Sequence, residues 1–259
     1  MLFVSVPTKR LQDQLVELGA EAHSRLPDWE PHVDSIAVVV GVDPVDVHLA
    51  LGLDCEIHDI ESLWSTRVRT FEANLRNEQR APRRQSPVLS PPDTRWSEQA
   101  ERLIARLRKA LGPSVHRIDH IGSTSVLGLP AKNLIDIQVV AEDLGSALEM
   151  ARKSRRAGFV RVDGDWFGED REGTKFREEV AVDTDPGRPV NVNFRSQSDP
   201  VWRETLLFRN LLRTNNEERD NYAEMKLSLE KESQSVDDYG ELKMSYIRAA
   251  LKRTGTSPL

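Results

Sequence analysis

The clearest pattern of apolar and polar positions lies in the middle of the chain, where two short runs alternate with a period of two. These runs cover residues 117–121 and 134–140, and such alternation predicts half-buried β-strands. Between them the sequence changes to small and hydroxyl-bearing residues with Gly128 and Pro130, which predicts a loop. We therefore expect a strand, a small-residue loop, and a second strand that carries one carboxylate, Asp136.

Apolar residues recur at helical spacing elsewhere in the chain. The helices we expect are residues 8–26, 45–53, 60–76, 96–111, 144–156, 200–213, 217–231 and 236–252, the last capped by Ser235. The further strands we expect are residues 35–42, in a parallel sheet, 159–162, 176–182 and 190–194. Residues 163–174 are rich in glycine and acidic residues, which predicts a mobile loop. The last two strands flank Asp185-Pro186-Gly187, which predicts an antiparallel hairpin.

Composition narrows the class of protein. With 259 residues and 38% hydrophobic content, the chain has enough apolar side chains for one or two domains. Its net charge of -6 gives no general basic field for nucleic acid. No apolar run approaches the roughly 20 residues that cross a bilayer, and Cys55 is the lone cysteine. We expect a cytoplasmic protein.

The loop between the two central strands has the chemistry of an anion site. Gly122 allows close approach of the backbone to a ligand, and the amides and hydroxyls of Ser123, Thr124 and Ser125 can surround a phosphate. Asp136 would face the same site as a metal or hydroxyl ligand. The alternatives are a plain tight turn, with the Asp136 carboxylate hydrogen-bonded to loop amides.

Two neighbouring residues extend this candidate site. A histidine has an ordinary pKa that suits proton transfer near neutral pH, so His120 is a candidate for that role; a buried structural histidine is an equal alternative. Lys132 follows Pro130 and Ala131 and could contact a phosphate oxygen, or it could be a solvated loop lysine.

The residues Asp119-His120-Ile121-Gly122-Ser123-Thr124-Ser125-Val126, with Gly128-Leu129-Pro130-Ala131-Lys132 and Ile135-Asp136-Ile137, resemble the GrpB family of small bacterial proteins. The resemblance extends over residues 88–253. It implies a fold related to the nucleotidyltransferases, in which a loop holds a triphosphate and strand carboxylates hold Mg²⁺. Arg209, Lys226 and Lys243 match positions of the family pattern and could line the cleft with positive charge, or they could be ordinary surface residues, while Asn193 could hydrogen bond to a ligand. The site would bind a nucleotide or another phosphorylated small molecule.

The sequence departs from a working nucleotidyltransferase at two places. Such enzymes carry two carboxylates at positions i and i+2 of a strand, so that both lie on one face and share metal ions. Here the second position is Gln138. In the later strand, Asn191 and Asn193 stand where the family tends to have histidines, and an amide takes up no proton at neutral pH.

The first part of the chain has a second resemblance. In actinobacteria the GrpB domain occurs fused behind dephospho-coenzyme A kinase, and residues 35–44 and 63–75 resemble late segments of that kinase. The chain contains no Gly-x-x-x-x-Gly-Lys-Ser/Thr string, so we expect no kinase activity. Because Met1 lies close to the first of these segments, we expect the ATP-binding half to be absent.

These observations predict a mixed α/β (α+β) protein with three parts. Residues 1–76 form a smaller α/β remnant of the kinase, residues 77–94 a proline- and charge-rich linker, and residues 95–253 a nucleotidyltransferase-like sheet with flanking helices. Two functions remain open. One is binding of a phosphorylated ligand, with Mg²⁺ if any transfer occurs; the other is a non-catalytic folding-accessory or protein-interaction module related to coenzyme A biosynthesis.

Overall fold

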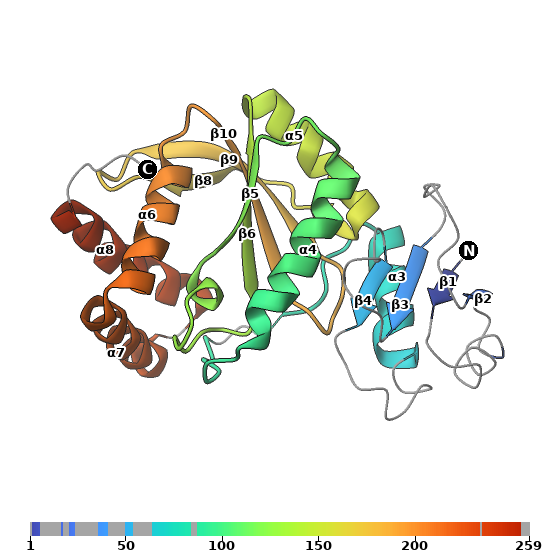
Figure 1. Cartoon of the computed structure of the whole chain (residues 1–259), viewed down its shortest axis with the longest axis horizontal. Helices are drawn as coiled ribbons and strands as arrows, with labels where there is room; N and C mark the ends of the chain where they lie inside the picture. Colours follow the sequence, from blue (N-terminus) through green and yellow to red (C-terminus); the bar gives the residue numbers. More distant parts are fainter. Residues whose placement is uncertain are drawn as a thin grey trace.

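The computed structural model describes residues 2–5, 17, 21–23, 36–40, 50–53, 64–83, 87–233 and 235–254. These residues form a small parallel sheet at the N-terminal end and a larger mixed sheet with helices around it (Figure 1). The predicted mixed α/β class is therefore confirmed. No helix in these ranges is both long and apolar enough to span a membrane.

The N-terminal sheet has four parallel strands in the order β2-β1-β3-β4. They are β1 (Leu2–Ser5), β2 (Glu21–His23), β3 (Ile36–Val40) and β4 (Ala50–Leu53). The prediction of a parallel strand at residues 35–42 is confirmed by β3. Strands β2 and β4 lie in stretches that we expected to be helical, and those predictions were wrong there because pairing with the neighbouring strands overrides weak helical periodicity. Most of the rest of both stretches, and Cys55, lie outside the described residues.

The larger sheet has six strands in the order β5-β6-β10-β9-β7, with β8 paired to β9. They are β5 (Arg117–Ile121), β6 (Ile135–Ala141), β7 (Phe159–Arg161), β8 (Trp166–Glu169), β9 (Lys175–Asp183) and β10 (Val190–Ser196). The predicted hairpin is confirmed by the antiparallel pairing of β9 with β10. The prediction of a loop over residues 163–174 was wrong for Trp166–Glu169. These residues form β8 because they pair with the first residues of β9.

The described helices close to the larger sheet are α3 (Arg69–Arg76), α4 (Arg95–Leu111), α5 (Leu144–Lys153), α6 (Val201–Thr214), α7 (Asn216–Glu232) and α8 (Val236–Thr254). Five of these six helices agree with prediction to within a few residues, whereas α3 begins nine residues after the predicted start at residue 60. A π-helical turn, Trp64–Val68, precedes α3, and a 3₁₀ turn, Ser123–Ser125, follows β5. The backbone N–H of Asp238 donates to Ser235 Oγ over 3.1 Å, which confirms the predicted cap.

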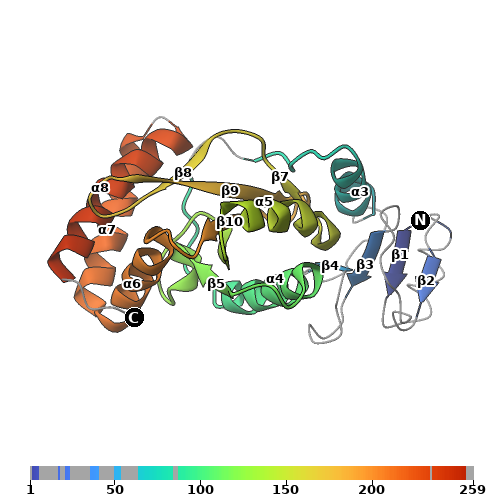
Figure 2. The same ribbon diagram turned by 90° about the horizontal axis from the view of Figure 1, so that it is seen from above.

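The two faces of the sheet have different chemistry. Helices α4 and α5 cover one face, and the alternate residues of β6 and β10 that point toward them are apolar and fully buried (Figure 2). The residues between them face the other side, where α6 and α8 lie, and apart from Val140, which packs against Trp202 and Leu206 of α6, they are polar. This polar set is Asp136, Gln138, Asn191, Asn193 and Arg195. Strand alternation therefore places a polar floor under the C-terminal helices.

Candidate functional site

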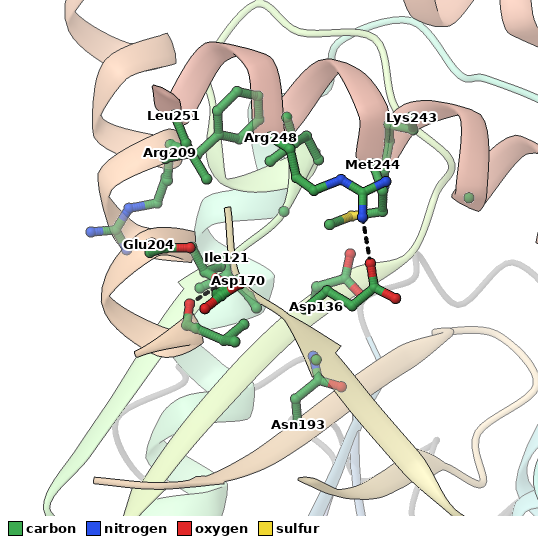
Figure 3. Close-up of a pocket in the computed structure, with 18 of the residues that line it drawn as sticks. Ile121, Asp136, Asp170, Asn193, Glu204, Arg209, Lys243, Met244, Arg248 and Leu251 are labelled. Carbon is green, nitrogen blue, oxygen red and sulfur yellow. Dashed lines mark hydrogen bonds and ion pairs between the residues drawn. The ribbon is translucent and has the colours of Figure 1, made fainter. Parts of the chain in front are cut away.

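A cavity of about 1020 Å³ lies between this polar floor, the strand β8, and helices α6 and α8 (Figure 3). Figure 3 shows Asp136 and Lys243 on opposite sides of it, the first on the sheet and the second on α8. Its polar and charged lining residues are Ser123, Asp136, Glu169, Asp170, Glu178, Asn193, Arg195, Glu204, Thr205, Arg209, Tyr222, Glu241, Lys243, Ser245 and Arg248.

The inner end of the cavity is built on the contact between Gly122 and Asp136. Gly122 has φ +69° and ψ -173°, a conformation that is essentially restricted to glycine. A Cβ at this position would lie only 2.6 Å from Asp136 Oδ2. Gly122 is therefore needed both for the turn and for the approach of the carboxylate.

Asp136 is held from the neighbouring strand. Asn191 Nδ2 donates to Asp136 Oδ1 over 3.0 Å, and Arg83 donates to Asn191 Oδ1 and to the Val190 carbonyl, each over 2.6 Å. Arg83 thus fixes the orientation of the Asn191 amide. No pattern in the sequence pointed to Arg83, which lies in the stretch we expected to be a linker.

Asp136 and Lys243 influence each other's ionisation. Burial raises the pKa of the Asp136 carboxyl, and the Lys243 ammonium opposes that rise. Burial likewise lowers the pKa of Lys243, and the Asp136 carboxylate opposes that fall. The inner end of the cavity therefore holds one acid and one base, each of which favours the charged form of the other.

The three hydroxyls of the predicted anion loop have different roles. Ser125 Oγ donates to the Gly122 carbonyl over 2.6 Å, and Arg213 donates twice to the Ser125 carbonyl. Thr124 and Ser125 are buried, and neither lines the cavity. Ser123 does line it, with a hydrogen bond between its side chain and Tyr222. Thr124 and Ser125 thus stabilise the turn from behind.

His120 lies on the other face of the sheet from Asp136. It pairs across β5 and β6 with Ile137, whose side chain points into the core under α4 and α5. Its Nε2 lies 3.0 Å from Thr124 Oγ1, and that hydroxyl donates to the Leu134 carbonyl, so we assign the proton to Nε2. Burial lowers the pKa of His120 to about 4, with Arg213 and Arg209 contributing. It is uncharged at neutral pH and does not line the cavity.

Two of the predicted lysines lie beside the cavity rather than in it. Lys226 is 1% exposed, its Nζ donates to the Pro130 carbonyl, and it lies 5.2 Å from the centre of the Tyr222 ring. Burial, with Lys243 and Lys132 nearby, lowers its pKa to about 7. Lys132 Nζ lies 5.4 Å from the centre of the Tyr239 ring. Both lysines connect the 122–132 loop to the C-terminal helices.

Six of the predicted site residues line the cavity: Gly122, Ser123, Asp136, Asn193, Arg209 and Lys243. Arg209 is tied to β5, because it donates to the His120 carbonyl over 2.9 Å and lies 3.9 Å from Asp119. Figure 3 shows its guanidinium directed away from Asp136. Lys243 is therefore the cation best placed to bind an anionic ligand at the inner end of the cavity.

The residues around Gln138 do not fit a resident Mg²⁺. Gln138 is fully buried; its Oε1 accepts from Arg195 over 3.1 Å, and its Nε2 donates to the Trp202 carbonyl over 3.2 Å. In the described part of the chain, no three His, Cys, Asp or Glu side chains are grouped so as to hold a metal ion. Asp136 alone, balanced by Lys243, does not supply the carboxylate pair that metal-dependent transfer uses.

A family model described as GrpB protein matches residues 86–253, and the chain belongs to the GrpB family. The chain is 38% identical to a dephospho-CoA kinase of Mycobacterium tuberculosis, over 63% of this chain and 44% of that protein. It is 32% identical to a UPF0157 protein of Halalkalibacterium halodurans, over 68% of this chain and 86% of that protein. The chain spans about half the length of the dephospho-CoA kinases that it matches.

The solved structure of the conserved protein GrpB from Enterococcus faecalis has the same fold. The two superpose with a TM-score of 0.51 at 24% identity, over 64% of this chain and 99% of that chain. A cytoplasmic RNA terminal U-transferase matches with a TM-score of only 0.35 at 16% identity, which is too distant to support an inference about function. The predicted family is thus confirmed.

Proposed function

We propose that this protein binds a phosphorylated small molecule or a nucleotide in the cavity, with the phosphate between Lys243 and the Gly122–Ser123 turn. The observation that carries this proposal is the inner end of the cavity, where Gly122, Ser123, Asp136, Asn193 and Lys243 converge. A cavity of about 1020 Å³ is at the upper end of the range for small-molecule sites, roughly 300–1,000 Å³.

The proposed function is binding rather than group transfer. Lys243 supplies the positive charge, and Asp136 orients Lys243 and accepts a hydrogen bond from a hydroxyl of the ligand. Most other acids on the wall already have partners: Glu178 pairs with Arg195 and Glu169 with Arg248, each over 2.7 Å. Since Gln138 replaces the second acid, we propose no reaction step and no resident metal.

The test is a thermal-shift and calorimetric titration of the full chain with adenosine diphosphate, ribose 5-phosphate and inorganic phosphate. A ligand at 100 times its dissociation constant stabilises the fold by about 2.7 kcal/mol. We expect stabilisation by at least one phosphorylated compound, loss of it in Lys243→Ala, and retention in Lys252→Ala, a lysine of the same helix that pairs with Glu172 outside the cavity.

Magnesium provides a second arm of the same test. Because the residues present do not fit a resident metal, chelation with EDTA should leave the affinity unchanged. Flat melting curves for all three compounds would contradict the proposed function.

A second function, a non-catalytic accessory module for a dephospho-CoA kinase, is favoured by a different observation. The stretch that resembles that kinase packs on the larger domain through Arg67 of the π-helical turn, which pairs with Asp185 over 2.7 Å, and through buried Phe71 of α3, which contacts Gly158. These contacts support the proposal that this surface of the larger domain binds the corresponding segment of a dephospho-CoA kinase. Flat melting curves in the titration above would favour this second function.

A further inference from the structure

The outer part of the cavity differs in chemistry from the inner end. In the described part of the chain, the large hydrophobic side chains that remain exposed include Trp166 at 39%, Phe167 at 48% and Leu242 at 45%, and all three line this cavity. The first two lie on β8 and the third on α8. The cavity is therefore polar at its inner end and aromatic and aliphatic at its mouth.

We propose that this apolar mouth binds a nucleobase, so that the ligand of the cavity is a nucleotide rather than a sugar phosphate or a free phosphate. This inference rests on the proposed function, because it takes the phosphate to lie near Lys243. A bare phosphate there would leave most of the 1020 Å³ empty. A planar base adds an apolar face that matches the Trp166 ring, which lies on the same side of β8 as Gly168 and faces the cavity floor, and stacking of this kind tolerates any base.

The Trp166 ring is held in place before any ligand arrives. Its Nε1 donates to the Val162 carbonyl over 3.0 Å, and a Cβ at Gly164 would lie 3.2 Å from the same nitrogen. The glycine therefore allows the indole to lie against the backbone while its remaining surface stays open to the cavity. A ring that is already fixed loses little conformational entropy on binding.

The strand that carries both rings is attached to the rest of the cavity wall. Glu169, two residues after Phe167 and on the same side of β8, accepts from Arg248 of α8 over 2.7 Å, as the dashed line at Arg248 in Figure 3 shows. On the other side of β8, a Cβ at Gly168 would lie 3.0 Å from Val201 of α6. Strand β8 is therefore fixed on both sides, and Trp166, on the same side as Gly168, forms part of a preformed wall.

The experiment compares adenosine monophosphate with ribose 5-phosphate, which carries the same phosphate without the base, by calorimetry on the full chain. We expect the nucleotide to bind about tenfold more tightly, or better, because a stacked base adds to the affinity. In Trp166→Ala the two compounds should bind equally. Leu227→Ala, which removes a similarly exposed side chain on α7 outside the cavity, should keep the difference.

A second measurement uses the fluorescence of Trp166. The nucleotide should quench the emission of the wild-type protein, and this quenching should be absent in Trp166→Phe, which still binds. Equal binding of both compounds by the wild-type protein, or an undiminished preference in Trp166→Ala, would overturn the nucleobase proposal and leave the phosphate site standing. Binding of neither compound would overturn both proposals, and loss of both only in Lys243→Ala would support the phosphate site.

Discussion

At the scale of single residues, the site depends on the absence of a side chain at Gly122. The backbone there has a positive φ, and the space that a Cβ would fill is taken by the Asp136 carboxylate. Any substitution of Gly122 would therefore destabilise the fold in two ways, through backbone strain and through displacement of Asp136. The chain offers a way to separate them, because Gly112 has nearly the same backbone conformation, φ +78° and ψ -168°, and a Cβ there would have no atom within 4 Å.

We predict that Gly122→Ala lowers the free energy of unfolding by more than Gly112→Ala does. Strain in this region of backbone space costs about 1–3 kcal/mol, and both variants incur it. Only Gly122→Ala also displaces the Asp136 carboxylate, and it should weaken ligand binding as well. Urea denaturation of the two variants measures the difference. Equal losses of stability would mean that the Gly122–Asp136 contact contributes nothing beyond the turn itself.

The sequence identified which residues surround this turn, but it could not say on which side of the sheet each lies. His120 was a candidate because it lies just before Gly122, and Asp136 because it is the carboxylate of the strand that follows the loop. The register of β5 and β6 places Ile121 opposite Asp136 and His120 opposite Ile137, so the two candidates point to opposite faces. Strand register depends on pairing between distant segments, and a period-two pattern alone does not fix it.

At the scale of secondary-structure elements, Arg195 of β10 connects the strands of the floor with α6. Its Nε donates to Glu178 of β9 over 2.7 Å, and its Nη1 donates to Gln138 of β6 and to Thr205 of α6, each over 3.1 Å. Both ends of the Arg195–Glu178 pair are less than a tenth exposed. Removing one partner would leave the other charge buried without compensation.

We predict that Arg195→Met lowers the free energy of unfolding by about 3–5 kcal/mol. The Arg195→Met/Glu178→Leu double variant should recover much of this loss, because two apolar side chains replace the charge pair. Chemical denaturation of the two single variants and the double variant forms the thermodynamic cycle. If the double variant is as unstable as the sum of the two single variants, the pair is not coupled and this account of the floor is wrong.

The elements that the sequence predicted well are those whose own side chains carry a strong pattern. The alternation Val190-Asn191-Val192-Asn193-Phe194 has its apolar set in the core and its polar set on the cavity floor. Strand β8 was not predicted because its sequence, Trp-Phe-Gly-Glu, shows no alternation of apolar and polar residues. It forms a strand because it pairs with β9. The aromatic mouth of the cavity was missed for the same reason.

At the scale of the whole molecule, the segment before the GrpB match is packed against the larger domain. Phe71 and Leu75 of α3 are buried, and a Cβ at Gly158 would lie 3.2 Å from the Phe71 ring. Asn74 Nδ2 donates to the Thr184 carbonyl over 2.9 Å, in the turn between β9 and β10. These contacts lie at the end of the sheet where Figures 1 and 2 show α3 beside α5.

Charged groups reinforce this packing at the same turn. Arg67 donates to both carboxylate oxygens of Asp185, over 2.8 and 2.7 Å, and its guanidinium occupies the place where a side chain at residue 187 would begin. Gly187 is therefore needed for the ion pair. The neighbouring Asp183 accepts from Arg106 over 2.8 Å, and burial raises the pKa of its carboxyl to about 6. Acidic residues of one turn thus bind basic residues from two helical segments.

We therefore predict that the cooperative unit of folding begins near residue 64 rather than at residue 95, where sequence alone placed the domain boundary. Phe71→Ala in the full chain should lower the free energy of unfolding of the larger domain by about 3–5 kcal/mol, because it leaves a cavity against Gly158. Arg76→Ala, on the exposed side of the same helix and paired only with Glu72 in the contacts described, should change it by about 0.5 kcal/mol or less. Hydrogen exchange at the amides of Val182 and Thr184 reports on the turn itself, and unchanged protection there in Phe71→Ala would show that α3 folds independently of the sheet.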